Sequence, residues 1–465
     1  MEEKLHPKRW LILWVVNMGT FISTLDVGIV NVALPTMAEE FGVNLSVMQW
    51  VVTCYLLTLV ALLPILGKLS DKWGRNKIYT LGFFVFTFGS LLIALSTSFA
   101  SLIVFRCAQG LGAAMIMANS QAMVRQVFPD RERGKALGIN AIIISLGTLS
   151  GPAVGGWILG MASWPVLFWI NVPLGLAAVI MGMKWFPRME TTAPGKLDAA
   201  GSVMLALAAS TLLYAAVSIQ EHGMASLSAG MGLFGLVALV CFLIYERRID
   251  DGIIDMELFA NRTIWVGNAS SFFIHLAQMA SLIPGTFYLQ SVLKMDPGAV
   301  GIFLALQPIA MGLSAPLAGW YRDRYSAKMP VMLGAALCSI SALFIVFAGA
   351  IHPAAIALHL IFFGAGMGLF QATNNADIMS AAPSAKLSLA SSMLALIRYL
   401  GMIAGIGLAA LFVGYLGPDT VHSAALDMRM KWLFGVCAVF CAAIVYLASI
   451  RFQRQNVQSN SDLSA

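Results

Sequence analysis

The amino-acid sequence predicts an all-α integral membrane protein with fourteen transmembrane helices, arranged as two six-helix halves with a two-helix insertion between them. Three observations predict this fold class: an apolar composition, a series of long apolar runs, and a motif that occurs twice. Of the 465 residues, 59% are hydrophobic and 11% are charged, whereas a soluble protein carries about 25% charged residues. The mean hydropathy is +0.83. This composition excludes a soluble enzyme, a disordered scaffold and a nucleic-acid-binding domain.

Long apolar runs define the expected helices. A helix that crosses the hydrocarbon core of a bilayer, which is ~30 Å thick, needs about 20 mostly apolar residues. The first run is too long for a signal-peptide core, and no small-residue cleavage pattern follows it, so we expect it to remain as a span. The expected spans lie near residues 11–33, 46–66, 78–96, 101–124, 137–159, 166–186, 198–219, 229–245, 263–283, 300–320, 331–350, 354–376, 388–413 and 430–450.

The distribution of positive charge predicts the orientation. An even number of spans places both termini on one side of the membrane, and the side richer in Lys and Arg is the cytoplasmic one. Of the 28 Lys and Arg residues, 23 lie in the termini and in the loops on the same side. The opposite loops hold Lys294, Arg429 and Lys431, while Arg106 and Arg398 lie inside spans. We therefore expect a multi-pass protein of the cell membrane with both termini in the cytoplasm.

Neither the loops nor the cysteines indicate catalysis. The loops are too short for a soluble catalytic domain, and no GxxxxGK[ST] sequence occurs, which excludes a self-contained ATP-driven pump. The six cysteines fall inside apolar runs without metal-ligand spacing, so we expect small buried hydrophobic side chains. We expect no catalytic residue, no metal site and no cofactor. The polar stretch 451–465 is expected to be a loose cytoplasmic tail.

A short motif occurs twice, at two helix ends that are both expected to be cytoplasmic. Residues 64–72 read PILGKLSDK and residues 316–324 read PLAGWYRDR, so that Pro, Gly, Asp and a following base recur at the same spacing. Secondary transporters commonly consist of two repeated halves with the substrate site between them. We therefore expect an N-terminal six-helix bundle at 1–186, a linker with two extra helices at 187–262 and a C-terminal six-helix bundle at 263–450.

Four motifs coincide with these spans and with the loop between two of them. They read LDVGIVNVALP at 25–35, GKLSDKWGRNK at 67–77, RCAQGLGAA at 106–114 and GTLSGPAVGG at 147–156. Together they resemble the major facilitator superfamily and, within it, the branch of fourteen-helix drug:proton antiporters. The resemblance covers nearly the whole chain and includes SSMLALIRYLG around Arg398. It implies a multidrug efflux transporter that works by alternating access.

The resemblance also implies a conformational latch at residues 67–77. In the family, the carboxylate at the position of Asp71 holds its helix against a neighbouring helix in the outward-open state. The alternative is a plain cytoplasmic charge cluster that anchors the topology. In the second copy of the motif, Ala327 stands where Arg75 stands in the first, so the second latch is less complete. The latch residues are Gly67, Asp71, Gly74, Arg75 and Asp323.

Glycine and proline in the motif at 147–156 predict a helix that bends and packs tightly against another, as small residues allow in membranes. Generic close packing is the alternative. In the family this motif belongs to exporters, and that association supplies the expected direction of transport. The residues concerned are Gly147, Gly151, Pro152, Gly155 and Gly156.

Asp26 is the only acidic residue well inside an expected span. A carboxylate within a membrane is costly and marks a functional site by default. At about 1.5 Å per residue, Arg106 lies at a similar depth, so we expect the two to pair or to share a hydrogen-bond network. Binding and release of a proton by Asp26 would then loosen and restore the pair. The alternative is a static ion pair that holds helices together without titrating.

A polar stripe on the same span limits where Asp26 can face. Asn17, Thr20 and Thr24 form one stripe, whereas Asp26 lies about 180° from Asn17 at about 100° per residue. We expect the stripe to serve helix packing or a cavity wall. Asp26 would then face the span at 101–124 or at 137–159, which makes direct substrate contact by Asp26 less expected.

Polar groups of the second half predict a substrate cavity. Arg398 lies near the middle of its span without an acidic residue at its depth, so either an anionic substrate group or backbone carbonyls would satisfy it. His275 lies mid-span and could relay protons, although a lone helix histidine is more often part of the hydrogen-bonded structure. The cavity candidates are Tyr55, Asn268, His275, Gln278, Gln371, Asn374, Asn375 and Arg398.

These features predict a proton-coupled exporter of small amphipathic compounds, with a small-molecule substrate, protons and the lipid bilayer as its partners. We expect a monomer and no nucleic-acid partner. One alternative is an exporter or importer of one specific metabolite, such as an anion recognised by Arg398. The other is a non-transporting membrane scaffold or receptor, which predicts no ligand-driven proton flux and no need for Asp26.

Overall fold

A computed structural model describes residues 7–43, 45–48, 50–187, 198–222, 226–249, 256–295, 297–348, 352–413 and 424–462. Helices make up almost all of these ranges, and no strand occurs within them. The all-helical fold class is therefore confirmed for the part of the chain that the structure describes.

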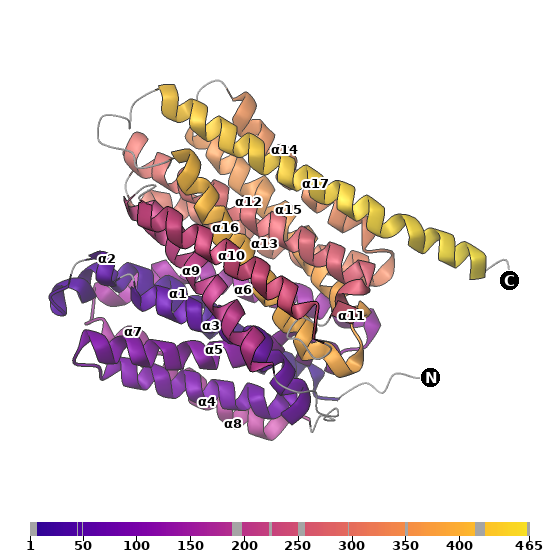
Figure 1. Cartoon of the computed structure of the whole chain (residues 1–465), viewed down its shortest axis with the longest axis horizontal. Helices are drawn as coiled ribbons and strands as arrows, with labels where there is room; N and C mark the ends of the chain where they lie inside the picture. The colour runs from indigo at the N-terminus through magenta and orange to yellow at the C-terminus, as the bar shows by residue number, and fades with distance from the viewer. Residues whose placement is uncertain are drawn as a thin grey trace.

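The N-terminal helices run back and forth along one common direction (Figure 1). Loops of a few residues join most of them, so that consecutive helices lie antiparallel. These helices are α1 (Arg9–Glu40), α2 (Leu45–Met48), α3 (Trp50–Trp73), α4 (Arg75–Ala94), α5 (Phe99–Val127), α6 (Asp130–Leu159), α7 (Pro165–Trp169) and α8 (Asn171–Trp185).

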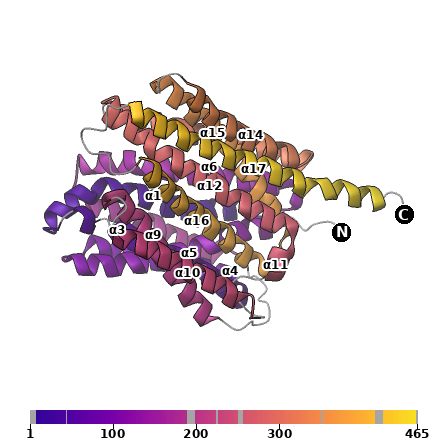
Figure 2. The ribbon, with the colours of Figure 1, turned by 45° about the horizontal axis from the view of Figure 1, so that its top comes forward.

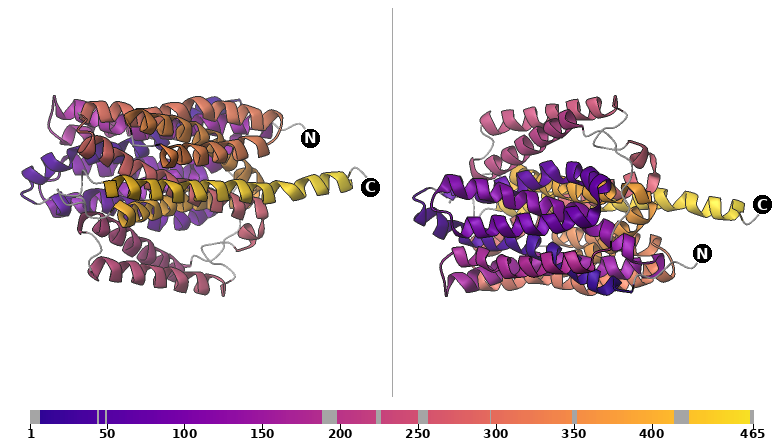
Figure 3. Two further views of the ribbon diagram at one scale, coloured as in Figure 1. Left: turned by 90° about the horizontal axis from the view of Figure 1, so that it is seen from above. Right: turned by 90° about the horizontal axis from the view of Figure 1, so that it is seen from below.

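The helices that follow continue the same pattern. A hairpin of two helices comes first and stands to one side of the bundle (Figure 3). A short helix then leads into the C-terminal group. These helices are α9 (Ala199–His222), α10 (Ser226–Glu246), α11 (Met256–Ala260), α12 (Arg262–Phe287), α13 (Pro297–Arg324), α14 (Lys328–Phe347), α15 (Pro353–Ala381), α16 (Leu387–Val413) and α17 (Ala424–Asp462).

Eleven helical segments of the described chain are long and apolar enough to cross a membrane. They include α7 and α8 taken together as one segment, 165–185. The remaining expected spans, 137–159, 198–219 and 263–283, coincide with α6, α9 and α12, which do not reach that combination of length and apolar character over their described residues. A series of buried polar side chains, including Asn268, Ser271 and His275, lowers the apolar character of α12.

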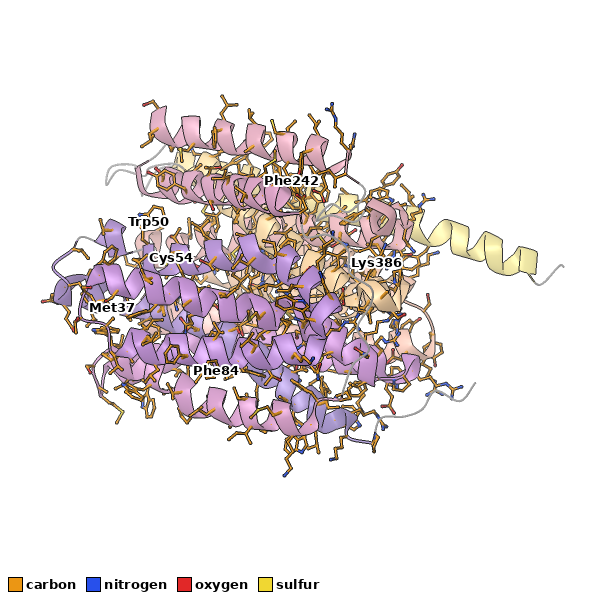
Figure 4. The ribbon with its side chains drawn as sticks, turned by 60° about the horizontal axis from the view of Figure 1, so that its bottom comes forward. Met37, Trp50, Cys54, Phe84, Phe242 and Lys386 are labelled. Carbon is orange, nitrogen blue, oxygen red and sulfur yellow. The ribbon has the colours of Figure 1, made fainter. Side chains whose placement is uncertain are left out.

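Both ends of the described chain lie at the same end of the bundle (Figure 1). There α1 begins and α17 finishes, and Lys386, just before α16, lies near that end, far from Met37 of α1 (Figure 4). The expected loose tail is wrong for residues 451–462, because α17 continues as helix to Asp462. Neither Gly nor Pro interrupts this stretch, and Arg451 is buried.

The cysteines differ in part from the expectation. All six are free, and Cys54, Cys338, Cys437 and Cys441 are buried. Cys241 is exposed and Cys107 is half-buried. The prediction of burial is therefore wrong for these two thiols, because an apolar residue of a membrane helix can face outward from the bundle as well as inward.

The N-terminal and C-terminal helices meet along two seams. At one seam α6 packs against α13, and at the other α16 packs against α3 and α5. Helix α9 contacts both α3 and α16, so the α9–α10 hairpin covers the second seam (Figure 3). This arrangement places α1, α3 and α5 next to the interior of the molecule, where the candidate site lies.

Candidate functional site

Asp26 and Arg106 form a buried ion pair between α1 and α5. Nη1 of Arg106 lies 2.6 Å from Oδ2 of Asp26, and the two side chains are 0% and 1% exposed. Nε of Arg106 donates to the carbonyl oxygen of Val51 at 2.9 Å. The helices therefore hold both charges out of water, and each charge compensates the other, as a low-dielectric site requires.

Two amides complete the surroundings of the Asp26 carboxylate. Nε2 of Gln109 donates to Oδ1 of Asp26 at 2.9 Å, and Nδ2 of Asn171 donates to the same oxygen at 3.2 Å. Gln109 also accepts from Nη1 of Arg106. The sequence interpretation missed both amides. Gln109 lies three residues after Arg106, on the same helix face, which could have revealed it, whereas nothing near Asn171 in the sequence points to Asp26.

Tyr55 lies against this pair and is fully buried. Its ring centroid is 4.5 Å from the guanidinium carbon of Arg106, a distance at which a cation is attracted to an aromatic face. Its hydroxyl donates to the carbonyl oxygen of Ser23 at 3.3 Å. The structure thus places this cavity candidate beside the ion pair and holds it by its hydroxyl.

The polar stripe of α1 faces away from Asp26, as the helical wheel predicts. Nδ2 of Asn140 on α6 donates to Oδ1 of Asn17 at 2.8 Å, and the hydroxyls of Thr20 and Ser120 lie 3.0 Å apart. All four side chains are buried. The stripe therefore joins α1 to α5 and α6, while Asp26 turns toward α5 and α8.

The first copy of the repeated motif connects the N-terminal helices to α16. Asp71 accepts hydrogen bonds from the backbone N–H groups of Ser388 and Leu389, each at 3.1 Å. These donors lie in the first turn of α16, where a carboxylate interacts favourably with the helix dipole. Arg75 pairs with Asp71 at 2.7 Å and donates to the carbonyl oxygen of Ser384 at 2.7 Å.

The glycines of this motif have separate roles in the contact. A Cβ atom on Gly67 would overlap the side chain of Ser392 on α16, so the glycine allows α3 and α16 to touch. Gly74 has φ +102°, a backbone conformation that side chains with a Cβ rarely adopt. It ends α3 and starts α4, and thereby positions Arg75 toward α16.

The second copy makes an equivalent contact in spite of Ala327. Oδ1 and Oδ2 of Asp323, at the end of α13, accept from the backbone N–H groups of Gly134 and Lys135 at 2.9 and 3.0 Å. These donors lie near the start of α6. Arg322 pairs with Asp323 at 3.2 Å. The carboxylate is thus held by the preceding arginine, and the contact does not need a base at position 327.

A further polar cluster lies at the same end of the C-terminal helices. Asp377 of α15 pairs with Arg322 at 3.3 Å and with Arg451 at 2.9 Å. The Ser380 hydroxyl accepts from Arg322 at 2.9 Å and from Arg133 of α6 at 3.1 Å. The cluster joins α13, α15 and α17 to each other and to α6. The sequence interpretation missed it because its members are far apart in the chain.

The motif at 147–156 packs α6 against α1, but its glycines differ. A Cβ on Gly151 would lie 2.6 Å from Cα of Gly28, and one on Gly155 would lie 3.1 Å from the Ile29 carbonyl oxygen. A Cβ on Gly147 would overlap the side chain of Thr24. A Cβ on Gly156 would meet no described residue of another segment within 4 Å. The side chain of Pro152 lies outside the described residues.

Several cavity candidates of the C-terminal helices are buried polar groups. Nδ2 of Asn374 donates to the Gly267 carbonyl oxygen at 2.9 Å and its Oδ1 accepts from Arg451 at 2.7 Å, so this residue joins helices. Nδ2 of Asn268 donates within α12, to the carbonyl oxygen of Ile264, at 2.9 Å. Among the described residues, three of these candidates have a buried amide oxygen without a hydrogen-bond partner: Asn268, Gln278 and Gln371. Asn375 is 9% exposed.

His275 and Arg398 lie on neighbouring helices, α12 and α16. Nδ1 of His275 donates to the carbonyl oxygen of Ser271 at 2.7 Å. Arg398 is 8% exposed, and its guanidinium carbon lies 5.2 Å from the Tyr399 ring centroid. The structure thus places these two predicted residues on helices that pack against each other.

Comparison with known protein families agrees with this architecture. The sequence model of the Major Facilitator Superfamily matches residues 16–267 and 268–463. The two matched segments together cover most of the chain, and they meet inside α12, between residues 267 and 268.

Two curated proteins illustrate the similarity. The riboflavin transporter RibZ of Clostridioides difficile is 34% identical over 462 residues, which cover 98% of this chain and 100% of that protein. The multidrug resistance protein Stp of Mycobacterium tuberculosis is 29% identical over 397 residues, which cover 85% of this chain and 74% of that protein.

A solved structure shares the fold. The human organic anion transporter MFSD10 (TETRAN) superposes with a TM-score of 0.66 and 15% sequence identity, covering 95% of this chain and 100% of that one. At this level of identity the likeness concerns the fold alone.

Proposed function

Because the chain belongs to the Major Facilitator Superfamily, and is thus a multi-pass membrane transporter of the multidrug type and not an enzyme, we propose that it is a proton-coupled exporter of small amphipathic compounds. Export runs against the gradient of the compound, and protons that enter in exchange supply the energy. The transporter alternates between a state open to the outside and a state open to the cytoplasm.

The architecture that we propose has fourteen transmembrane helices. Helices α1 and α3–α8 form the six spans of the first half, α9 and α10 form the insertion, and α12–α17 form the second half, with the boundaries 1–186, 187–262 and 263–450. Both termini lie in the cytoplasm and the protein acts as a monomer in the cell membrane. The start of α1 and the finish of α17 lie at the same end of the bundle (Figure 1), and the loops expected at that end carry most of the positive charge. Both observations support this orientation.

The ion pair of Asp26 and Arg106 is the observation that carries the proposal. Asp26 is the acid that a membrane-embedded proton site needs, and all its described partners are donors: Arg106, Gln109 and Asn171. A proton on the carboxylate would remove its charge and leave Arg106 uncompensated, which weakens the link between α1 and α5. Proton binding thereby changes the stability of one packing arrangement relative to another, as coupling requires.

The two carboxylates at the helix ends supply the elements that switch. Asp71 holds the start of α16 and Asp323 holds the start of α6. Each bond crosses from one half to the other at the cytoplasmic end, so both must break before that end opens. This arrangement corresponds to a state closed to the cytoplasm, and rocking of the halves would break both contacts together.

The energy from protons is sufficient for efflux. One proton that enters gains about 2.3 kcal/mol per 100 mV of membrane potential and about 1.4 kcal/mol per pH unit. A substrate gradient of tenfold requires about 1.4 kcal/mol. Exchange of one or two protons therefore supports gradients of about 10-fold to 1000-fold.

The test is substrate-driven proton movement in proteoliposomes with an internal pH dye. Addition of an efflux substrate to vesicles with a preformed pH difference should dissipate that difference with the native protein, and not with Asp26→Asn. Glu132→Gln is the matched control, because Glu132 pairs with Arg9 at a partly exposed position away from the ion pair. Equal dissipation with Asp26→Asn and with the native protein would remove Asp26 from the coupling role.

A second candidate function is export or import of one specific metabolite. The chain is similar over nearly its whole length to a protein named as a riboflavin transporter, and this similarity favours the second candidate. It predicts that one compound drives proton movement while structurally unrelated drugs do not. The same vesicles distinguish the two candidates when riboflavin and several unrelated amphipathic drugs are compared at equal concentration.

A further inference from the structure

Arg398 is a buried cation without a counter-ion on its own or the neighbouring helix. No acidic residue occurs between 258 and 295 or between 378 and 418, so neither α12 nor α16 offers a carboxylate. Asp26 compensates Arg106, and Asp377 pairs with Arg322 and Arg451 at the helix ends. The middle of the α12–α16 pair therefore carries one positive charge, at Arg398, that no carboxylate of these two helices compensates, which is costly unless an anion neutralises it.

The guanidinium group of Arg398 also lacks hydrogen-bond partners within the described chain. Backbone carbonyls of α16 were one expected way to satisfy it, but no hydrogen bond joins them to Arg398. Its guanidinium lies over the ring of Tyr399, which attracts the charge but accepts no planar pair of hydrogen bonds. The 8% of the side chain that remains exposed leaves its donors accessible from the interior of the molecule.

Close packing of α12 and α16 determines which groups surround this cation. The two helices run side by side (Figure 2), and a Cβ on Gly401 would lie 2.5 Å from the Phe272 carbonyl oxygen. His275 lies about one turn after Phe272, on the helix that packs against α16. Since a carbonyl only accepts, the bond from Nδ1 to Ser271 requires a proton on Nδ1, and Nε2 of the neutral ring is then an acceptor.

The same cation lies on a helix that packs against the other half. Tyr399, whose ring lies beside the Arg398 guanidinium, is on α16, and Tyr55, which lies against Arg106, is on α3. Helices α3 and α16 contact each other. A ligand at Arg398 would therefore contact the surface along which the halves move.

We propose that Arg398 binds an anionic group of the transported compound, so that amphipathic organic anions are a substrate class of this protein. The planar guanidinium donates a pair of hydrogen bonds to a carboxylate or a similar anion, and Nε2 of His275 accepts from a donor on the same ligand. The ligand supplies the negative charge that this part of the membrane interior lacks. The proposal rests on the proposed transport function and specifies its substrate.

Binding of matched probes to purified protein in nanodiscs tests the proposal. The probes are 7-diethylaminocoumarin-3-carboxylate, its neutral carboxamide and an analogue with a trimethylammonium group, and their binding is followed by fluorescence. The native protein should bind the carboxylate at least about 10-fold more tightly than the carboxamide, because a charge-assisted bond inside a protein supports such a difference. Arg398→Gln should remove this preference, and Arg398→Lys should retain part of it.

Controls separate a lost site from a lost fold. Arg9→Gln removes a positive charge at the helix ends, outside the proposed site, and should leave the preference unchanged. If Arg398→Gln does not fold, Arg398→Lys still tests the site, and a ratio of carboxylate to carboxamide affinity equal to that of the native protein would contradict it. An equal ratio in Arg398→Gln and in the native protein would overturn the proposal outright.

The outcome does not depend on proton coupling. Binding in nanodiscs requires no gradient, so Asp26→Asn should retain the preference for the carboxylate even when it abolishes proton movement in vesicles. Loss of coupling with an intact preference would count against the role of Asp26 alone. An intact coupling with equal affinities for all three probes would count against the anion site alone.

Discussion

The glycines of the motif at 147–156 give the sharpest prediction about packing. Gly151→Ala adds a methyl group where a Cβ would lie 2.6 Å from Cα of Gly28. Carbon atoms in contact prefer about 3.5–4.0 Å, so α1 and α6 must separate locally by about 1 Å. The added methyl group would meet backbone atoms of Gly28 and Leu25, so no side-chain rotation can relieve the overlap. Overpacking of this kind costs about 1–3 kcal/mol.

Gly156→Ala is the matched control in the same motif. No described residue of another segment lies within 4 Å of a Cβ at Gly156, and alanine favours helix over glycine by about 0.5–1 kcal/mol. The two substitutions are chemically identical and lie five positions apart, but the structure predicts opposite signs. Because the helix preference of alanine applies at both positions, their free energies of unfolding should differ by the overpacking cost alone, about 1–3 kcal/mol.

Thermal unfolding of both variants in the same detergent, followed by tryptophan fluorescence, measures the difference. Gly151→Ala should unfold at a lower temperature than the native protein, and Gly156→Ala at the same or a higher temperature. Equal unfolding temperatures for the two variants would refute the close backbone contact of α1 and α6. A loss of stability in Gly156→Ala alone would show that the wrong glycine was assigned to the contact.

Two further predictions concern charges. Arg106→Ala should abolish transport while the protein still inserts and folds, because Asp26 can take up a proton and remain neutral without its partner; full transport by this variant would contradict the paired site. Asp71→Asn should weaken the bonds to the start of α16, each worth about 1.5–3 kcal/mol as a charged acceptor, and favour opening of the cytoplasmic end. Spin labels at Lys77→Cys and Lys386→Cys should then report longer distances than with native Asp71, and an unchanged distance distribution would show that Asp71 does not hold the two halves together.

The ion pair shows how much of the site could be predicted from local information. Depth along a helix follows from a constant rise per residue, so Asp26 and Arg106 could be placed at one level before their helices were placed side by side. The opposite orientation of Asn17 follows from the same periodicity. Gln109 is within reach of this reasoning because it shares a helix face with Arg106. Asn171 is not, because its contact with Asp26 depends on where α8 packs.

The second latch shows a different limit. Because Ala327 stands where the first copy has an arginine, the sequence predicted a weaker contact. That prediction considered only residues at matching positions of the two copies. In the structure Arg322, which stands where the first copy has Ser70, pairs with Asp323. Its further partners, Asp377 and Ser380, come from α15. Such compensation depends on neighbours that the repeat does not contain.

The sequence by itself determined that this protein lies in a membrane, where most of its helices run, which end carries the positive charge and which acid is buried among apolar residues. These properties depend on composition, run length and helical periodicity, all of which are local. The tertiary structure alone decided which glycine touches another backbone and that Arg451 is buried within a helix that continues to Asp462. It also decided that, among the described residues, Arg106 pairs with a carboxylate and Arg398 does not. Those outcomes depend on how each helix is rotated and how deep it lies relative to its neighbours. Contacts between residues that are far apart in the chain determine both.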